Sequence, residues 1–152
     1  MLDDGLREQS KGAALHARVR LSALGFEKHL KVLGIRFLGV RTEQHEELTS
    51  LMRDVMGMKL TREKEDLTGL QLDDGTTVEV YGPGDAAHVF FGNAAVVGFL
   101  VDDFDAARAE MESVGVDFLG RVQHEAGTSW NHFRGPDGNI YEIIGPGKET
   151  EQ

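Results

Sequence analysis

One phrase of the chain occurs twice, as DGTTVEVYGPG at residues 74–84 and as DGNIYEIIGPG at residues 137–147. Both copies open on Asp-Gly, close on Gly-Pro-Gly and are offset by 63 residues without a gap. Each copy also keeps one glutamate between apolar residues, Glu79 in the first and Glu142 in the second. Self-similarity at a fixed offset in a chain of 152 residues indicates an internally duplicated module.

The segment before the first copy has the signals of a strand, a helix and a hairpin. Residues 35–40 (IRFLGV) are short, apolar and partly β-branched, which predicts a buried strand. An apolar stripe at helical spacing follows and ends at Gly57, and we expect it to cover the sheet. Residues 67–81 then read as two strands around Asp-Asp-Gly. The stripe consists of Leu48, Leu51, Met52, Val55 and Met56.

The same order recurs before and through the second copy. Residues 96–101 (VVGFLV) predict a strand, and a helix opened by acidic residues and ended by Gly115 follows. Three further strands are expected at residues 116–122, 129–133 and 140–144. The helix stripe consists of Phe104, Ala107, Met111 and Val114.

These signals predict an α+β fold of two tandem βαβββ modules, whose curved mixed sheets surround a cup. The expected boundaries are an N-terminal extension at 1–32 (an arm or a partly disordered segment), a first module at 33–84, a linker at 85–94, a second module at 95–147 and a tail at 148–152.

Alternation along the last strand of each module indicates which side chains face the helices. Val78 and Val80 share one face in the first copy, as do Tyr141 and Ile143 in the second. If the helix stripes cover that face, Glu79, Tyr81 and Glu142 point away from the helices and into the cup. The alternative is that the two glutamates are solvated acids on an open sheet face.

Charge and composition exclude several classes of partner. The chain has a net charge of −10, and only residues 1–36 are basic, with seven Lys/Arg against four Asp/Glu. An acidic body repels phosphate backbones, so we expect no nucleic-acid partner. No apolar run approaches the roughly 20 residues of a membrane span, so we expect no membrane partner either. The absence of cysteine fits a cytoplasmic location.

The paired modules, together with LMRDVMGMKL at residues 51–60 and FRGPDGNIYEII at residues 133–144, resemble the vicinal oxygen chelate superfamily. That superfamily includes glyoxalase I, extradiol dioxygenases, methylmalonyl-CoA epimerase and the fosfomycin- and bleomycin-resistance proteins. The resemblance covers about residues 33–147. It implies metal ligands on the first and last strands of each module, and a homodimer whose modules pair across a two-fold axis to complete the cups.

Only half of the metal ligands that the resemblance implies are present. Glu79 and Glu142 match the last-strand positions, whereas the first-strand positions fall on Ile35 and Val96, whose side chains cannot donate a lone pair. Two carboxylates alone make a poor transition-metal site. His132 is the best replacement ligand, because it precedes Glu142 by ten residues on the neighbouring strand. His88, in the predicted linker, can reach the rim of the cup.

Two functional hypotheses follow. In the first, the cup binds a small hydrophobic or aromatic molecule without turnover, as bleomycin-resistance proteins do, and no metal is required. In the second, the chain is a lyase, isomerase or ring-cleaving dioxygenase that uses a divalent Zn, Ni, Fe or Mn ion. The expected ligand-binding residues are Phe37, Glu79, Tyr81, Trp130 and His132, the expected catalytic residues are His132 and Glu142, and the expected metal ligands are Glu79 and Glu142.

Overall fold

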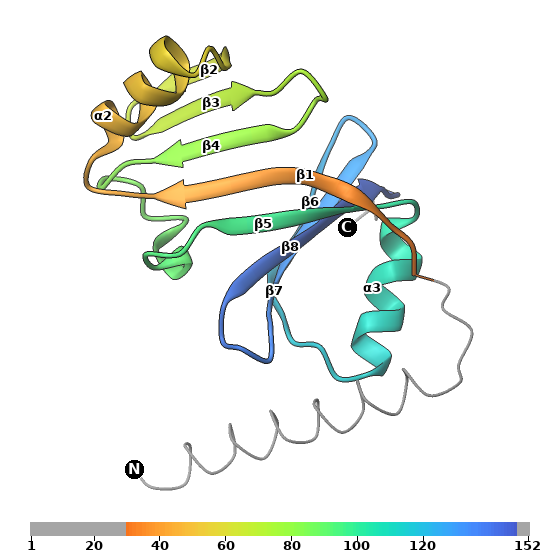
Figure 1. The fold of residues 1–152 in the computed structure, drawn as a ribbon. Coiled ribbons are helices and arrows are strands. Elements are labelled where there is room, and N and C mark those ends of the chain that lie inside the picture. The colour runs from red at the N-terminus through yellow and green to blue at the C-terminus, as the bar shows by residue number, and fades with distance from the viewer. Residues whose placement is uncertain (1–29, 149–152) are drawn as a thin grey trace, which may run out of the picture.

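The computed structural model of the chain describes residues 30–148, which fold into one curved, mixed sheet with helices over different halves of it (Figure 1). The strands lie in the order β2-β3-β4-β1-β5-β8-β7-β6. Their bounds are β1 Val32–Arg41, β2 Lys59–Lys64, β3 Leu67–Gln71, β4 Thr77–Tyr81, β5 Val96–Val101, β6 Phe118–Glu125, β7 Thr128–Arg134 and β8 Ile140–Pro146. The helical segments are α2 His45–Ser50, η1 Leu51–Val55, η2 Val89–Phe91 and α3 Phe104–Ser113.

The two modules meet edge to edge at the centre of the sheet. Strand β1 pairs with β5 antiparallel, and each of them pairs on its other side with the last strand of its own module in parallel. The order of strands is therefore the same on both sides of the β1–β5 seam. This arrangement confirms the predicted α+β fold of two tandem βαβββ modules.

The helix of the second module packs as its apolar spacing predicts. Asp103 caps it, because its Oδ1 accepts a hydrogen bond from the backbone N–H of Ala106 at 3.0 Å. The chain leaves the helix through Gly115, whose φ of +91° lies in the left-handed region. Phe104 and Ala107 are buried against Val101 and Ile143. The second module thus has a core between α3 and the sheet.

The helix of the first module does not pack as predicted. Leu51, Val55 and Met56 are 48%, 77% and 58% exposed, so most of the expected stripe does not cover the sheet. The helix changes at Leu51 into a π-helical segment, in which the backbone N–H of Met56 bonds the carbonyl of Leu51 at 3.0 Å. An i→i+5 turn breaks the 3.6-residue period on which the predicted stripe depends.

Strand β2 (Lys59–Lys64) was not individually predicted. Every residue in it is exposed, and four of its six side chains are charged, so it has no apolar alternation. It lies at one edge of the sheet, where charged side chains discourage pairing with other chains. Pattern reasoning therefore missed a strand that is defined by its hydrogen bonds to β3.

Most of the predicted N-terminal extension, residues 1–29, lies outside the described residues, as do residues 149–152. Leu30 packs against the core beneath α3, and β1 begins two residues later. No helix within residues 30–148 is long and apolar enough to cross a membrane.

Candidate functional site

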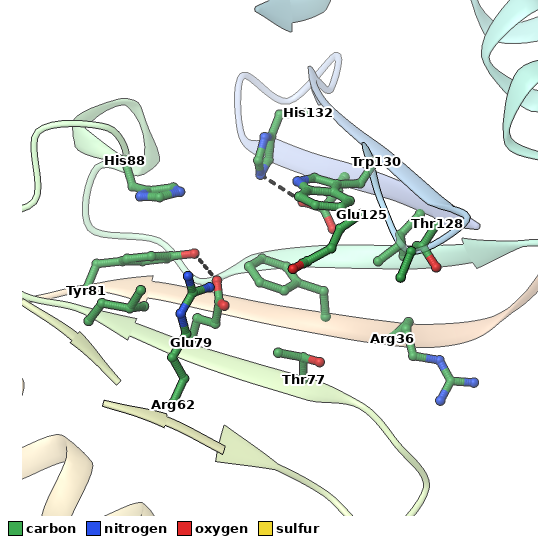
Figure 2. Close-up of a pocket in the computed structure, with 15 residues that line it drawn as sticks. Arg36, Arg62, Thr77, Glu79, Tyr81, His88, Glu125, Thr128, Trp130 and His132 are labelled. Atoms are coloured by element: carbon green, nitrogen blue, oxygen red, sulfur yellow. Dashed lines mark hydrogen bonds and ion pairs between the residues drawn. The ribbon is translucent and has the colours of Figure 1, made fainter. Parts of the chain in front are cut away.

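A cavity of about 580 Å³ lies between the two modules (Figure 2). The first module lines it from β1, β2, β3 and β4, and the second module lines it from β6, β7 and β8. All six residues that the sequence placed in the site line this cavity; they are Phe37, Glu79, Tyr81, Trp130, His132 and Glu142. The described part of a single chain therefore forms one cup without a second copy.

The two repeated glutamates occupy corresponding places in the sheet. Glu79 pairs with Gly39 of the first module, and Glu142 pairs with Gly98 of the second. A Cβ atom at Gly98 would come within 2.8 Å of Oε1 of Glu142 and 2.7 Å of Cβ of Phe37. Because Gly98 has no side chain, the carboxylate of Glu142 can lie over strand β5 at this position.

Glu142 is paired with His132 inside the protein. The two residues are direct partners across β7 and β8, and Nε2 of His132 lies 3.0 Å from Oε2 of Glu142. The contact is close but poorly aligned for a hydrogen bond, and the buried Nε2 has no well-aligned partner among residues 30–148. Burial raises the pKa of Glu142, which is 2% exposed, although contact with His132 opposes the rise. An imidazole next to such a carboxyl group can exchange a proton with it.

Glu79 is engaged by a neighbour on its own strand. The phenol of Tyr81 donates a hydrogen bond to Oε2 of Glu79 (Figure 2). Burial raises the pKa of Tyr81, and the negative charge of Glu79 raises it further, so the phenol remains protonated and keeps donating. One carboxylate oxygen of Glu79 is therefore committed to an internal hydrogen bond.

The segment between the modules adds aromatic groups next to the cavity that the sequence only partly indicated; of these, His88 lines it. His88 was expected at the rim, and its ring stacks on Tyr81 with centroids 3.8 Å apart. The rings of Phe91 and Tyr81 meet edge to face with centroids 5.7 Å apart, and the ring of Phe90 lies 5.2 Å from that of His132. The two phenylalanines thus connect the aromatic groups of one module with those of the other. Neither stood out in the sequence, because a short apolar pair in a linker has no period.

Several polar residues on the cavity wall were also missed. They are Arg36, Arg62, Thr77, Glu125 and Thr128. The alternation in β4 could have found Thr77, which shares a face with Glu79. Arg36 could not be found that way, because the pairing register of β1 shifts between Ile35 and Phe37.

The donor set does not fit a transition-metal site. Ile35 is 54% exposed at the start of β1, and Val96 is buried against Phe37. Glu79 is bonded to Tyr81, and Glu142 is in contact with His132. Within residues 30–148 no three His, Cys, Asp or Glu side chains converge in a way that could hold a metal ion. The predicted ligands Glu79 and Glu142 thus do not join an imidazole in one group of three donors, and zinc, nickel or iron sites ordinarily include imidazole among about four or more ligands.

The fold and the cavity define a class of protein in which two βαβββ modules surround one binding cavity. Comparison with known families agrees with this class. Residues 34–143 match the model of the Glyoxalase/Bleomycin resistance protein/Dioxygenase superfamily. The chain belongs to this superfamily. A comparison with curated proteins by sequence found no match.

Solved structures from several organisms share the fold. Methylmalonyl-CoA epimerase from Mycobacterium tuberculosis superposes with a TM-score of 0.59 at 17% identity, over 84% of this chain and 97% of that one. The Mn(II)-bound glyoxalase from Novosphingobium aromaticivorans gives a TM-score of 0.62 at 20% identity, over 81% of this chain but only 43% of the longer relative. A superfamily member from Vibrio splendidus gives a TM-score of 0.54 at 17% identity, over 76% of this chain and 98% of that one. At these identities the similarity shows the fold alone.

Proposed function

We propose that this protein binds a small hydrophobic or aromatic molecule in the cup between its modules, with an incomplete set of metal ligands. The observation that carries the proposal is the composition of the cavity wall. Phe37, Tyr81 and Trp130 present aromatic rings to the same space, and Leu67 and Ile144 add aliphatic surface. Burying a flat ring among such groups is favourable, both through the apolar area removed from water and through ring stacking.

The polar groups in the cavity support binding rather than chelation. Tyr81 donates a hydrogen bond to Glu79, and His132 is in contact with Glu142, so both acids already have partners within the protein. Threonine hydroxyls at Thr77 and Thr128 can orient a ligand by hydrogen bonds. This arrangement can select and hold a small molecule, which is what a sequestering protein needs.

A second candidate is an enzyme of the lyase, isomerase or dioxygenase kind. The observation that favours it is the buried contact between His132 and Glu142, the two residues with predicted catalytic roles. A buried carboxyl group next to an imidazole can take a proton from a bound substrate and return it. The fold relative that holds Mn(II) is a glyoxalase, so a divalent ion belongs to this candidate, and Glu79 and Glu142 remain its proposed ligands.

One experiment separates the two candidates. Metal content and uptake of p-xylene, a compact aromatic probe, are measured for the purified wild type, for Glu142→Ala and for Glu46→Ala, an exposed control on α2. We expect less than stoichiometric metal in all three proteins and binding of the probe by wild type and control. Stoichiometric zinc, nickel, iron or manganese that is lost only in Glu142→Ala would overturn the proposal in favour of the enzyme.

The assembly proposed for this protein is a homodimer. Its support is the apolar surface that Leu51, Val55 and Met56 expose, which an interface would cover. The cup is lined within one chain, so the dimer is not needed to complete it. Sedimentation of the wild type should give a dimer mass and Val55→Asp a smaller one; a monomeric wild type would contradict the proposal. The cytoplasmic location, and the absence of nucleic-acid and membrane partners, stay predictions from the sequence.

A further inference from the structure

The segment between the modules holds a histidine whose tautomer is set by a neighbouring carboxylate. Nδ1 of His88 lies 2.9 Å from Oδ2 and 3.1 Å from Oδ1 of Asp85, and Oδ1 also accepts a hydrogen bond from the backbone N–H of His88 at 2.8 Å. Although burial opposes it, the bonds from His88 lower the pKa of Asp85, so this carboxylate is ionised and only accepts. Nδ1 therefore carries the proton, and in the neutral ring Nε2 presents a lone pair.

The ring of His88 is held in place at the wall of the cavity. One face of the ring stacks on Tyr81 at an angle of 17°, and Phe91 approaches at 5.1 Å. The side chain stays 26% exposed and lines the cavity. Figure 2 shows the ring of His88 lying over Tyr81. Among residues 30–148, Nε2 has no hydrogen-bond partner, although Nδ1 has two.

We propose that His88 binds the ligand, with Nε2 accepting a hydrogen bond from a hydroxyl group on an aromatic ring. The inference rests on the proposed function and narrows its ligand to phenol-type molecules. The aromatic wall of Phe37, Tyr81 and Trp130 selects a flat ring. Nε2 of His88, which has no partner among the described residues, selects a hydrogen-bond donor at the edge of the ligand ring. Asp85 is the positioning residue, because it holds the imidazole of His88 through Nδ1.

The other charged groups on the wall do not favour an acid over a neutral hydroxyl. Glu79, Glu125 and Glu142 line the cavity against two arginines, Arg36 and Arg62, so the wall carries no net positive charge that would attract an anionic ligand. The phenol of Tyr81 is used by Glu79, and Nε2 of His132 lies against Glu142. His88 is thus the imidazole of this cavity whose outer nitrogen is uncommitted within the described residues.

The test compares two probes of one shape, p-cresol and p-xylene, which differ by a hydroxyl in place of a methyl group. Calorimetric titration of the wild type should give tighter binding of p-cresol by about two- to tenfold, the contribution of one hydrogen bond. His88→Phe keeps a ring to stack on Tyr81 but removes the acceptor, so the two probes should bind it equally. Asp85→Asn should reduce the preference for p-cresol. His124→Gln is the control, because His124 bonds Ser129 and does not line the cavity.

A spectroscopic measurement reports on the histidine directly. Imidazole nitrogen spectra of the wild type, assigned by the signal lost in His88→Phe, should show the Nδ1-protonated tautomer, and p-cresol but not p-xylene should shift the Nε2 resonance. An Nε2-protonated ring, or equal binding of both probes by wild type and His88→Phe, would overturn the role of His88 and leave the aromatic cavity standing. Failure of the wild type to bind either probe would overturn the proposed function together with this inference.

Discussion

The two modules repeat one plan, yet their helices are used differently. In the second module, α3 buries Phe104 and Ala107 against β5 and β8. In the first, α2 passes into a π-helical segment and leaves Leu51, Val55 and Met56 exposed. A repeated pattern of apolar residues therefore does not guarantee repeated burial, because one inserted residue in a helical turn rotates the stripe away from its target.

The repeated acids differ in the same way. Glu79 is half-buried and takes a hydrogen bond from Tyr81, two residues along its own strand. Glu142 is almost completely buried and is in contact with His132 from the neighbouring strand. Duplication kept the register of both acids, whereas their partners and environments come from neighbours that are not repeated.

The largest expected effect concerns the two helices. Phe104→Ala should lower the free energy of unfolding by about 3–5 kcal/mol, because it removes a fully buried ring from the core under α3. In the monomer, Leu51→Ala should cost less than about 1 kcal/mol, because that side chain is already half in water there. Urea unfolding of both variants, at protein concentrations low enough to keep the chain monomeric, measures the contrast. Equal losses in the monomer would contradict it.

The next largest effect is the pH dependence of stability, which tests how the buried Glu142 differs from the half-buried Glu79. Burial raises the pKa of Glu142, so the folded protein holds this proton more tightly than the unfolded chain does. The stability that comes from this tighter proton binding is fully present below the pKa of Glu142 in the unfolded chain, about 4.3. It is lost as pH rises through the pKa of Glu142 in the folded protein. Glu142→Gln, which cannot ionise, should therefore gain stability relative to wild type as the pH rises above about 4.3, until the pH has passed the folded pKa of Glu142.

Thermal unfolding at several pH values checks this sign. The exposed Glu46→Gln on α2 serves as the control for replacing a glutamate outside the cavity. A Glu142→Gln variant that loses stability relative to wild type as pH rises would contradict the argument. That result would mean that contact with His132 outweighs the burial of the carboxyl group.

The smallest effect compares two tyrosines. Tyr81→Phe removes the donor to Glu79 from a buried position and should cost about 1 kcal/mol. Tyr141→Phe removes an exposed bond of 2.6 Å to Asp137 and should cost at most about 0.5 kcal/mol. Urea unfolding measures both. A larger loss for Tyr141 would reverse the ranking of the two modules' hydrogen bonds.

Much of the fold was predictable from residue patterns. The predicted strand at residues 96–101 coincides with β5, and the hairpin at 67–81 coincides with β3 and β4. Apolar alternation reports faces reliably because every second side chain of a strand points the same way. The edge strand β2 lacked that signal, and the π-helical segment could not be inferred because it is a matter of backbone hydrogen bonds.

The candidate site was predictable as a set of residues but not as a set of contacts. Alternation placed Glu79, Tyr81 and Glu142 on the cup side, where they line the cavity. It could not indicate that Asp85 would hold His88 or that Phe90 would approach His132. Such contacts join a linker to strands far away in the sequence, and no local period encodes them.

The amino-acid sequence by itself determined the duplication, the order of strands and helices apart from β2, and the side of the sheet on which each repeated acid lies. These properties follow from local spacing, which is a matter of backbone geometry. Only the tertiary structure decided which acid is buried, which imidazole is left with an uncommitted nitrogen, and which helix stays exposed. The reason is that burial and hydrogen-bond partners depend on what packs opposite a residue, and that is a relation between distant segments.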